Sequence, residues 1–546
     1  MYYLNLEEEF YKELDKFLHE YLRINPIAAT YLGIHKYDHL LPKGGWDGFN
    51  EEERFLHKFR DWLYDFIKNV DFSETSLDFR IDVDMLWRQI RLWEFQIYKW
   101  RIWAKYPSAP DNISTAIFLL FGRDFAPYEE RLKSIASRLE LSPIYLSRSR
   151  ELLIEPVKMY IDIGIEIARQ IPPSIDFIIN YSEIMVGENE YIDKMVKASS
   201  KLKEEVEDFI SWLDEVRKDA DEEYRIGKEL FDEMINIREL GYTSDDILKL
   251  GEKYLSHFKS EAVKLSKMIT GSENIKKTLE KLESKHPKDF DDIIDTYKRD
   301  IERARKFVIE NKIAPIPPGE SIKVLETPPY MAPIIPFAAY IGPAPFEDRK
   351  EGIYLVTRPS REEDYRRHNI YSISNTTVHE AYPGHHLQLA WSATKKNLAR
   401  LISVDTAFIE GWAHYCEDLM KEYGYDDTPE HRFIQVIDSI WRAVRVIIDV
   451  KLSRGDMEFD EAVDFLVNET GMDREAAISE VKRYVLSPGY QLSYLIGRHL
   501  FNEIRKEIKR IFGDRYSDYE FNRVILESCG IPFKYMKEYI LHKIKI

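Results

Sequence analysis

The chain has 546 residues, and its 78 lysines and arginines against 96 aspartates and glutamates give a formal net charge of −18. This acidic balance argues against a nucleic-acid-binding protein, because binding to phosphates requires a basic face. Hydrophobic residues make up 44% and charged residues 32%, which is typical of a folded protein rather than a disordered one. The two cysteines, Cys416 and Cys529, are too few for a disulfide framework or a cysteine-ligated zinc site.

The sequence also bears on the compartment in which the protein works. Its first residues, MYYLNLEEEF, show no basic segment followed by an apolar core, so no secretory signal is predicted. The longest apolar stretches, such as residues 116–121, are far shorter than the roughly 20 residues that a membrane-spanning helix needs. Together with the low cysteine content, these features lead us to expect a cytoplasmic protein with no membrane partner.

Amphipathic helices are predicted through the N-terminal part, residues 1–310. In the first of them, one helical face is marked by the spacing of Phe10, Leu14, Leu18 and Tyr21. Aromatic-rich and then charged stretches follow. Because burial stabilises large aromatic side chains, we expect these stripes to form helix–helix contacts.

A proline-rich region near residues 315–360 breaks this pattern. It holds ten of the 24 prolines, and proline at this density prevents continuous helix. Two segments with β-favouring residues, 321–327 and 352–357, are strand candidates, so we predict a small β element; the alternative is a linker between helical domains. Helical patterning resumes after Ser374. The expected fold class is therefore mostly α, a large multi-helix fold with this β element.

Histidines and carboxylates concentrate directly after the β element. The text TTVHEAYPGHHLQ contains His379, Glu380, His385 and His386, and FIEGWAHYCED adds Glu410. Imidazole and carboxylate are the zinc ligands that remain when cysteine is absent, and a catalytic site needs three of them and one open position. A glutamate beside a ligand can take the proton of the attacking water and pass it to a leaving group. We predict a metal site; the alternative is a hydrogen-bonded polar cluster of the core.

The spacing of these histidines differs from that of the common zinc helix. In H-E-x-x-H the histidines are four positions apart on one face, but here the fourth position after His379 is Pro383. On an ideal helix His385 would point about 120° away, and His386 would lie about 10 Å along the axis. Neither can share an ion with His379 unless the helix is distorted. Pro383 and Gly384 would cause a bulged turn, since proline lacks a donor and glycine relaxes the backbone limits.

The strings HEAYPGHHLQ and EGWAHYCE resemble those of the bacterial and archaeal domain-of-unknown-function-885 (DUF885) family. Its members look like metallopeptidases related to thimet oligopeptidase, angiotensin-converting enzyme and the thermostable carboxypeptidases. Residues 26–42, PIAATYLGIHKYDHLLP, and residues 487–497, SPGYQLSYLIG, are similar to the N-terminal and C-terminal signatures of that family. The resemblance therefore covers nearly the whole chain, although length alone would allow three or four domains.

The resemblance implies one domain over residues 1–546. It would consist of an N-terminal helical part (1–310), a proline-rich β insertion (311–360) and a helical part with the metal site (361–546). The active site is expected in a deep cleft between helices. The β element would flank the site, and an extended peptide could add as a strand to its edge.

The resemblance also implies a ligand set. The related peptidases use H-E-x-G-H, and aligning its Gly-His with Gly384 and His385 implies a two-residue insertion. This alignment places Glu410 25 positions after His385, similar to the distance to the third ligand in those peptidases. It therefore implies His379, His385 and Glu410 as ligands, with His386 as the alternate second ligand. Glu380 would be the general base and acid.

Residues around the reacting groups are implied less directly. Relatives use a tyrosine hydroxyl to stabilise the oxyanion, and the candidates are Tyr494, which is preferred, and Tyr490; the alternative for either is a core tyrosine. Three arginines could bind the C-terminal carboxylate of a peptide or act as structural ion-pair partners: Arg442, Arg445 and Arg498. Two residues could orient the metal ligands or form an ordinary helix-surface pair: His414 and Asp449.

The sequence thus predicts a zinc-dependent peptidase that hydrolyses short peptides, of carboxypeptidase or oligopeptidase type, with zinc-activated water and Glu380 as general base. One alternative is a metal-dependent hydrolase of a non-peptide amide or ester. Another is a non-catalytic helical binding protein that a metal stabilises. The natural substrate, the direction of cleavage, the oligomeric state and the working ion stay open, because histidine–glutamate sites accept several divalent metals.

Overall fold

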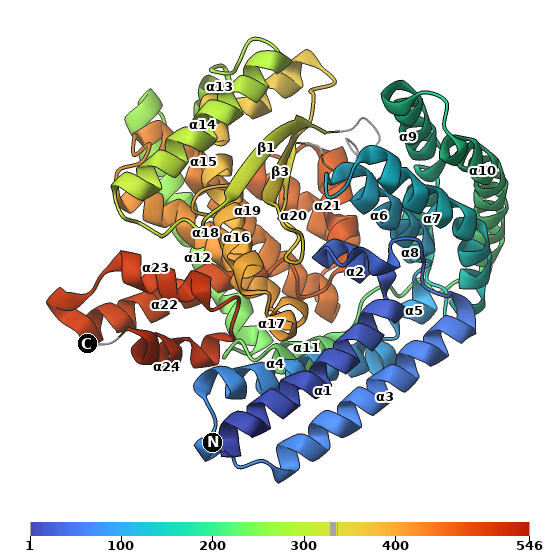
Figure 1. The fold of residues 1–546 in the computed structure, drawn as a ribbon. Coiled ribbons are helices and arrows are strands. Elements are labelled where there is room, and N and C mark those ends of the chain that lie inside the picture. Colours follow the sequence, from blue (N-terminus) through green and yellow to red (C-terminus); the bar gives the residue numbers. More distant parts are fainter. Residues whose placement is uncertain (1, 328–334, 336, 545–546) are drawn as a thin grey trace. The chain divides into compact units, whose positions relative to one another are not determined.

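Helices make up most of the chain in the computed structural model, which describes residues 2–327, 335 and 337–544 (Figure 1). The chain forms two compact units. The first contains residues 1–224 and 346–348, and the second contains residues 225–345 and 349–546. The mostly α fold class predicted from the sequence is confirmed. None of the described helices combines the length and the apolar composition that crossing a bilayer requires.

The first unit consists of helices joined by short connections. Its α-helices are α1 (Tyr2–Ile24), α2 (Pro26–Leu32), α3 (Gly45–Asn69), α4 (Leu77–Glu94), α5 (Ile102–Lys105), α6 (Ala109–Gly122), α7 (Tyr128–Ser149), α8 (Lys158–Ala168), α9 (Ile171–Val186) and α10 (Glu190–Val216). The predicted stripe on α1 is buried at Phe10, Leu14 and Leu18, which are 2 to 4% exposed. Phe10 packs on the rings of Trp62 and Phe66 of α3, as expected for a helix–helix contact.

The segment that resembles the N-terminal family signature forms α2 and the turn after it. Arg138 of α7 is fully buried and donates to Thr30 Oγ1 at 2.6 Å and to the carbonyl oxygen of Leu40 at 3.1 Å. Thr30 in turn donates to Asp38 at 2.6 Å. The polar residues of this signature therefore hold a helix and a turn together, since a buried guanidinium needs acceptors on all sides.

The second unit carries the small sheet and the remaining helices. These are α11 (Lys228–Arg238), α12 (Ser244–Thr270), α13 (Ile275–Glu283), α14 (Phe290–Glu310), β1 (Glu320–Glu326), β2 (Ala338–Ile341), β3 (Lys350–Val356), α15 (Ile370–Glu380), α16 (His385–Lys395), α17 (Leu398–Ser403), α18 (Thr406–Glu422), α19 (Pro429–Arg454), α20 (Phe459–Thr470), α21 (Arg474–Leu486), α22 (Ser493–Phe512), α23 (Asp518–Glu527) and α24 (Phe533–Lys543).

The sheet has the order β1-β3-β2, with β1 parallel and β2 antiparallel to the central strand β3. Figure 1 labels β1 and β3, which lie side by side. The pairing places Glu320 opposite Lys350 and Tyr340 opposite Tyr354. The two predicted strands are confirmed as β1 and β3, whereas β2 was not predicted because only four residues form it. Residues 328–334 and 336 of the proline-rich region lie outside the described residues.

Two helices meet at glycine next to the candidate ligands. A Cβ built on Gly411 of α18 would lie 2.4 Å from the Cα of Gly497 of α22, so the two backbones touch at this point. Neither position can accept a larger residue without separating the helices. This contact fixes the middle of α18, where Glu410 lies, against α22, which carries Tyr494.

Candidate metal centre

A break in the helix separates the two histidines of the motif. α15 ends at Glu380 and α16 begins at His385, so the single bulged helix expected from the sequence is instead two helices. The Gly384 amide donates to the carbonyl of Val378 at 3.1 Å, and a Cβ on Gly384 would lie only 1.8 Å from the carbonyl oxygen of His379. Only glycine fits here. The chain therefore folds back, and the ring centres of His379 and His385 are 4.8 Å apart.

Three side chains of the second unit converge on one point. The ligand atoms of His379, His385 and Glu410 all lie within 4.8 Å of one another. Nε2 of His385 is 3.2 Å and Nε2 of His379 is 3.8 Å from Oε2 of Glu410. Ligands bound tetrahedrally to one zinc ion at about 2.1 Å are roughly 3.4 Å from one another. The separations therefore suit one ion after small side-chain rotations.

One carboxylate oxygen of the cluster has no hydrogen-bond partner among the described residues. Oε2 of Glu410 is buried and makes no hydrogen bond among the described residues. The three residues are 5 to 9% exposed, so water does not freely solvate the carboxylate. A buried charged oxygen without a hydrogen bond is costly unless a cation balances it. The donor set and its burial fit a metal ion.

Outer atoms of two ligands are held by neighbouring side chains. Nδ1 of His379 is 2.8 Å from Glu417, which also accepts from the amide of Asn375 at 3.1 Å. The hydroxyl of Tyr490 donates to Oε1 of Glu410 at 2.6 Å. These contacts fix which atom of each ligand points inward, an arrangement typical of metal sites. Sequence reasoning missed both roles, although Glu417 follows Glu410 by seven positions and so shares its helical face.

His386 is directed away from this cluster. Its Nε2 is 2.6 Å from Glu320 of β1, and its Nδ1 is 2.7 Å from the hydroxyl of Tyr340 of β2. Glu320 also accepts from Arg305 at 2.9 Å and from the hydroxyl of Tyr382. Of the two candidate histidines, the structure thus brings His385 to the cluster and uses His386 to tie the start of α16 to the sheet.

Burial and opposite charges together set the protonation states in the cluster. Burial lowers the pKa of His379, but the neighbouring carboxylates of Glu410 and Glu417 outweigh this and raise it to about 9. Burial raises the pKa of Glu410, but the positive charges of the two histidines outweigh this and hold it well below its ordinary range. Glu410 is therefore ionised and His379 protonated at neutral pH. Metal binding releases such a proton, because only neutral imidazole coordinates.

Glu380, the candidate general base, differs from its neighbours in exposure. It is the one residue from Thr377 to Gln388 that is not buried. Its charge acts on His379 and on two buried tyrosines of α14 and β3, Tyr297 and Tyr354, whose pKa values are raised by burial first and by nearby acidic groups second. An accessible carboxylate directly after a metal ligand is well placed to exchange protons with a substrate.

The two candidate tyrosines both adjoin the cluster and contact each other. The ring of Tyr494 stacks over that of His379 at 6.3 Å and 16°, and it meets the ring of Tyr490 edge-on at 6.1 Å. Burial, followed by the charge of Glu410, raises the pKa of both tyrosines. Both hydroxyls therefore stay protonated at neutral pH and can donate. Tyr490 donates to Glu410, whereas Tyr494 stands beside a ligand ring.

The three candidate arginines all have carboxylate or carbonyl partners. Arg445 donates to Glu480 at 3.1 Å, Arg498 donates to Asp418 at 2.5 Å, and Arg442 donates to the carbonyl oxygen of Asp438 at 3.2 Å. The contacts of Arg445 and Arg498 are ion pairs of the kind named as the alternative from sequence, and Nη2 of Arg442 lies 3.9 Å from Oε1 of Glu417. Their role toward a peptide carboxylate stays a prediction.

His414 and Asp449, the two residues expected to orient ligands, contact other groups among the described residues. Nε2 of His414 lies 3.4 Å from Ser439 and 3.3 Å from Arg498, and its Nδ1 is buried without a hydrogen bond among the described residues. Asp449 accepts backbone N–H groups of Gly489 and Leu492 at 2.7 and 2.9 Å. His414 thus orients no ligand by contact, and Asp449 supports the loop of Tyr490.

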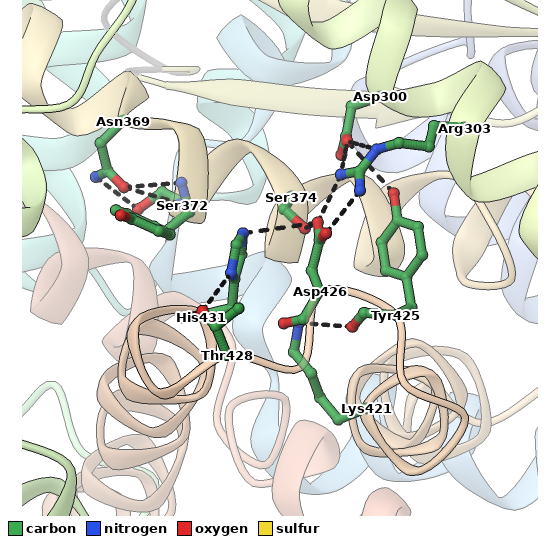
Figure 2. A network of polar contacts seen from close by, with 11 residues as sticks. Asp300, Arg303, Asn369, Ser372, Ser374, Lys421, Tyr425, Asp426, Thr428 and His431 are labelled. Carbon is green, nitrogen blue, oxygen red and sulfur yellow. Dashed lines mark hydrogen bonds and ion pairs between the residues drawn. The ribbon is translucent and has the colours of Figure 1, made fainter. Parts of the chain in front are cut away.

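A second polar network, centred on Asp426, involves α15 and α18, the helices that carry His379 and Glu410 (Figure 2). Arg303 donates to both carboxylate oxygens of Asp426 at 2.6 and 2.5 Å, and Ser374 of α15 donates to one of them at 2.5 Å. Lys421 of α18 donates to the carbonyl oxygens of Tyr425 and Asp426 at 3.2 and 3.0 Å. Here the cation is supplied by the protein itself.

Comparison with known proteins identifies the family. The chain belongs to the family described as "Bacterial protein of unknown function (DUF885)", which matches residues 26–540. No curated protein matches it. A solved structure from Shewanella oneidensis, of unknown function, is similar with a TM-score of 0.78 and 21% identity, covering 96% of this chain and 98% of that one. A structure from Colwellia psychrerythraea is similar with a TM-score of 0.82 and 16% identity, covering 96% of each chain.

These comparisons correct one expectation. Both solved structures are described by the words "putative lipoprotein", so the predicted cytoplasmic location is wrong. The cysteine argument behind that prediction was weak for a physical reason. Cys416 and Cys529 are both free and buried, and a protein without disulfides folds equally well in reducing and oxidising compartments.

Proposed function

We propose that this protein is a zinc-dependent peptidase of short peptides, with the ion held by His379, His385 and Glu410. The observation that carries the proposal is the convergence of three buried ligand atoms around a carboxylate oxygen that lacks a hydrogen bond. Two histidines and one glutamate form the ligand set of hydrolytic zinc sites, which keep a fourth position open. The resemblance of DUF885 members to metallopeptidases such as thimet oligopeptidase, drawn from the HEAYPGHH and EGWAHYCE strings, supports the same proposal.

The residues of the chain divide the work of amide hydrolysis. A bound zinc ion would act as a Lewis acid that polarises the scissile carbonyl and activates water. Glu380 accepts the proton of the attacking water and passes it to the leaving amine, since it is the accessible carboxylate beside the ligands. Tyr494 donates a hydrogen bond to the developing oxyanion, and its raised pKa keeps that proton available. Burial of the ligands limits competing water.

Metal analysis and a peptide assay test this proposal. Purified protein loaded with zinc and passed through a desalting column should keep close to one equivalent. A ladder of peptides with free and blocked C-termini should be cleaved, and a requirement for the free C-terminus would identify a carboxypeptidase. Less than about half an equivalent of zinc would refute the metal site. Zinc retention without turnover of any peptide would favour a hydrolase of another amide or ester.

Glu380→Gln isolates the proposed base. The amide keeps the size of the side chain but cannot accept a proton, so turnover should fall by about 100-fold or more while zinc stays bound. Glu215→Gln on α10 is a suitable control, because this glutamate is 72% exposed and pairs with Lys218 in the first unit. Turnover retained in Glu380→Gln would exclude the role assigned to this residue.

A further inference from the structure

The loop that carries Tyr490 is held rigidly on both sides. It connects α21 to α22, and the backbone N–H groups of Gly489 and Leu492 both donate to the carboxylate of Asp449. Gly489 has a φ of +81°, and a Cβ there would lie 2.5 Å from Cε of Met234. The backbone around Tyr490 is therefore fixed by hydrogen bonds and by close packing.

A buried arginine reaches this loop from another helix. Arg238 is the last residue of α11, its side chain is 7% exposed, and its Nη1 donates to the carbonyl oxygen of Gly489. Its Nε and Nη2 donate to Asp405 at 2.9 and 2.6 Å. Asp405 is the N-cap of α18, where its carboxylate accepts from the Ala407 amide at 2.7 Å.

One guanidinium thus joins the two elements that meet at the metal centre. On one side it bonds the residue before Tyr490, and on the other it bonds the cap of the helix in which Glu410 follows five positions later. A planar fork of donors can bind two acceptors in fixed directions, which a lysine ammonium cannot do.

We propose that Arg238 is a positioning residue of the metal centre, which acts through Tyr490. It holds the loop against the start of α18 so that the Tyr490 hydroxyl stays on Oε1 of Glu410 and leaves Oε2 for the ion. The inference rests on the metal site proposed above. No motif pointed to it, because Arg238 is separated from Asp405 by 167 residues and from Gly489 by 251.

If Arg238 formed only a structural ion pair, its replacement would lower stability without changing zinc affinity. The chain offers a matched control for this alternative. Arg505 of α22 has a side chain that is also 7% exposed and donates to both oxygens of Asp518, at 2.7 and 2.9 Å. Arg238→Lys and Arg505→Lys should therefore cost similar stability. Only the former should change metal binding.

The experiment measures zinc affinity by competition with a chelating indicator in four proteins: wild type, Arg238→Lys, Tyr490→Phe and the double variant. Each single change should weaken binding by about 10- to 100-fold, the usual effect of losing a residue behind a ligand. The double variant should bind no more weakly than Tyr490→Phe, because both changes remove the same contact. Arg505→Lys should stay within about threefold of wild type.

Outcomes distinguish this inference from the proposed function. If wild type binds zinc and Arg238→Lys binds it equally well, or if the two losses multiply, the positioning role is overturned. If wild type binds no zinc, the metal site fails, and hydrogen exchange of residues 487–493 decides instead. Faster exchange in Arg238→Lys but not in Arg505→Lys supports the role of Arg238 in holding the Tyr490 loop, and unchanged exchange refutes that role. Should Arg238→Lys not fold, Arg238→Gln with Asp405→Asn replaces it, since both charges then leave together.

Discussion

Two carboxylates of the same chain segment show how similar residues serve different ends. Glu410 lies in the middle of α18, and Asp426 lies just beyond its end. Both oxygens of Asp426 are bonded, mainly to Arg303, whereas Glu410 uses one oxygen for Tyr490 and directs the other at two histidines. In the Asp426 network (Figure 2) the guanidinium of Arg303 balances the carboxylate, whereas the groups that face Oε2 of Glu410 are the imidazoles of His379 and His385.

The histidines near the two carboxylates differ in the same sense. His431 has its Nε2 3.7 Å from Asp426, and its pKa falls to about 4 because burial and the nearby Lys421 and Arg303 disfavour its charged form. The pKa of His379 rises to about 9 because its carboxylate partners outweigh the effect of burial. A histidine can therefore stay neutral where an arginine already balances the carboxylate. Beside Glu410 and Glu417, the carboxylates instead favour the protonated form of His379, and a metal ion can replace that proton.

Glu410→Gln should give the largest difference in zinc affinity between changes in the Glu410 cluster and changes in the Asp426 network. The neutral amide is a poor metal ligand, so zinc affinity should fall by more than about 100-fold, beyond the effect of changes behind a ligand. Competition with a chelating indicator measures this loss. If Glu410→Gln binds zinc within about threefold of wild type, Glu410 is not a ligand and the contrast drawn with Asp426 fails.

Two glycines test the backbone of the same regions. Gly384→Ala should cost about 3 kcal/mol or more and weaken zinc binding, because the added Cβ meets the His379 carbonyl oxygen at 1.8 Å. Gly424, beside the Asp426 network, has a φ of +88° but open space around a Cβ, so Gly424→Ala should cost only about 1 kcal/mol. Urea denaturation of both variants checks the order. Equal losses would show that the helix break is not packed as described.

Asp426→Asn should act on stability and leave the metal centre unaffected. Removing the charge leaves Arg303 with one strong partner, Asp300, and should lower the free energy of unfolding by roughly 2 kcal/mol. Zinc affinity should change by less than about threefold. A large loss of zinc affinity in Asp426→Asn would mean that the two regions are coupled through α15 and α18.

The smallest expected effect is the dependence of the unfolding free energy on pH in acid, through Asp426. Burial raises the pKa of Asp426, but hydrogen bonds from Arg303 and Ser374 outweigh it and lower the pKa from 3.8 to about 2. Because the folded pKa is below the ordinary one, the stabilisation is complete above pH 3.8 and is lost as the pH falls toward 2. Arg303 is 49% exposed, so solvent screening keeps the contribution below roughly 2 kcal/mol. The difference in unfolding free energy between wild type and Asp426→Asn, measured from pH 5 to pH 2, should shrink over this interval; a constant difference would contradict the assignment.

Much of the fold and of the ligand set was accessible from the sequence. Helical periodicity identified the stripe of Phe10, Leu14 and Leu18, and proline density located the sheet region. Local chemistry also pointed to His379 and Glu410, and the Pro383–Gly384 pair marked where the helix had to deviate. These features depend on neighbours within a few turns of chain, so spacing alone reports them.

Contacts between distant segments could not be predicted in the same way. Glu417 supports His379 across 38 residues, Tyr490 supports Glu410 across 80, and Arg238 reaches the Tyr490 loop across 251. Such pairs depend on how helices cross, and no periodicity within one helix encodes the crossing. The predicted roles of His414 and the arginines were uncertain for this reason.

The sequence by itself determined which residue types stand near a distorted helix, and so predicted a histidine–glutamate site there, because residue type fixes what each side chain can bind. Only the tertiary structure decided which histidine takes part. The break at Gly384 turns His385 toward Glu410 and His386 toward the sheet, and glycine allows the close approach to the His379 carbonyl that this break requires. Adjacent residues of a helix point about 100° apart, so the direction of the first turn of α16 settles the choice.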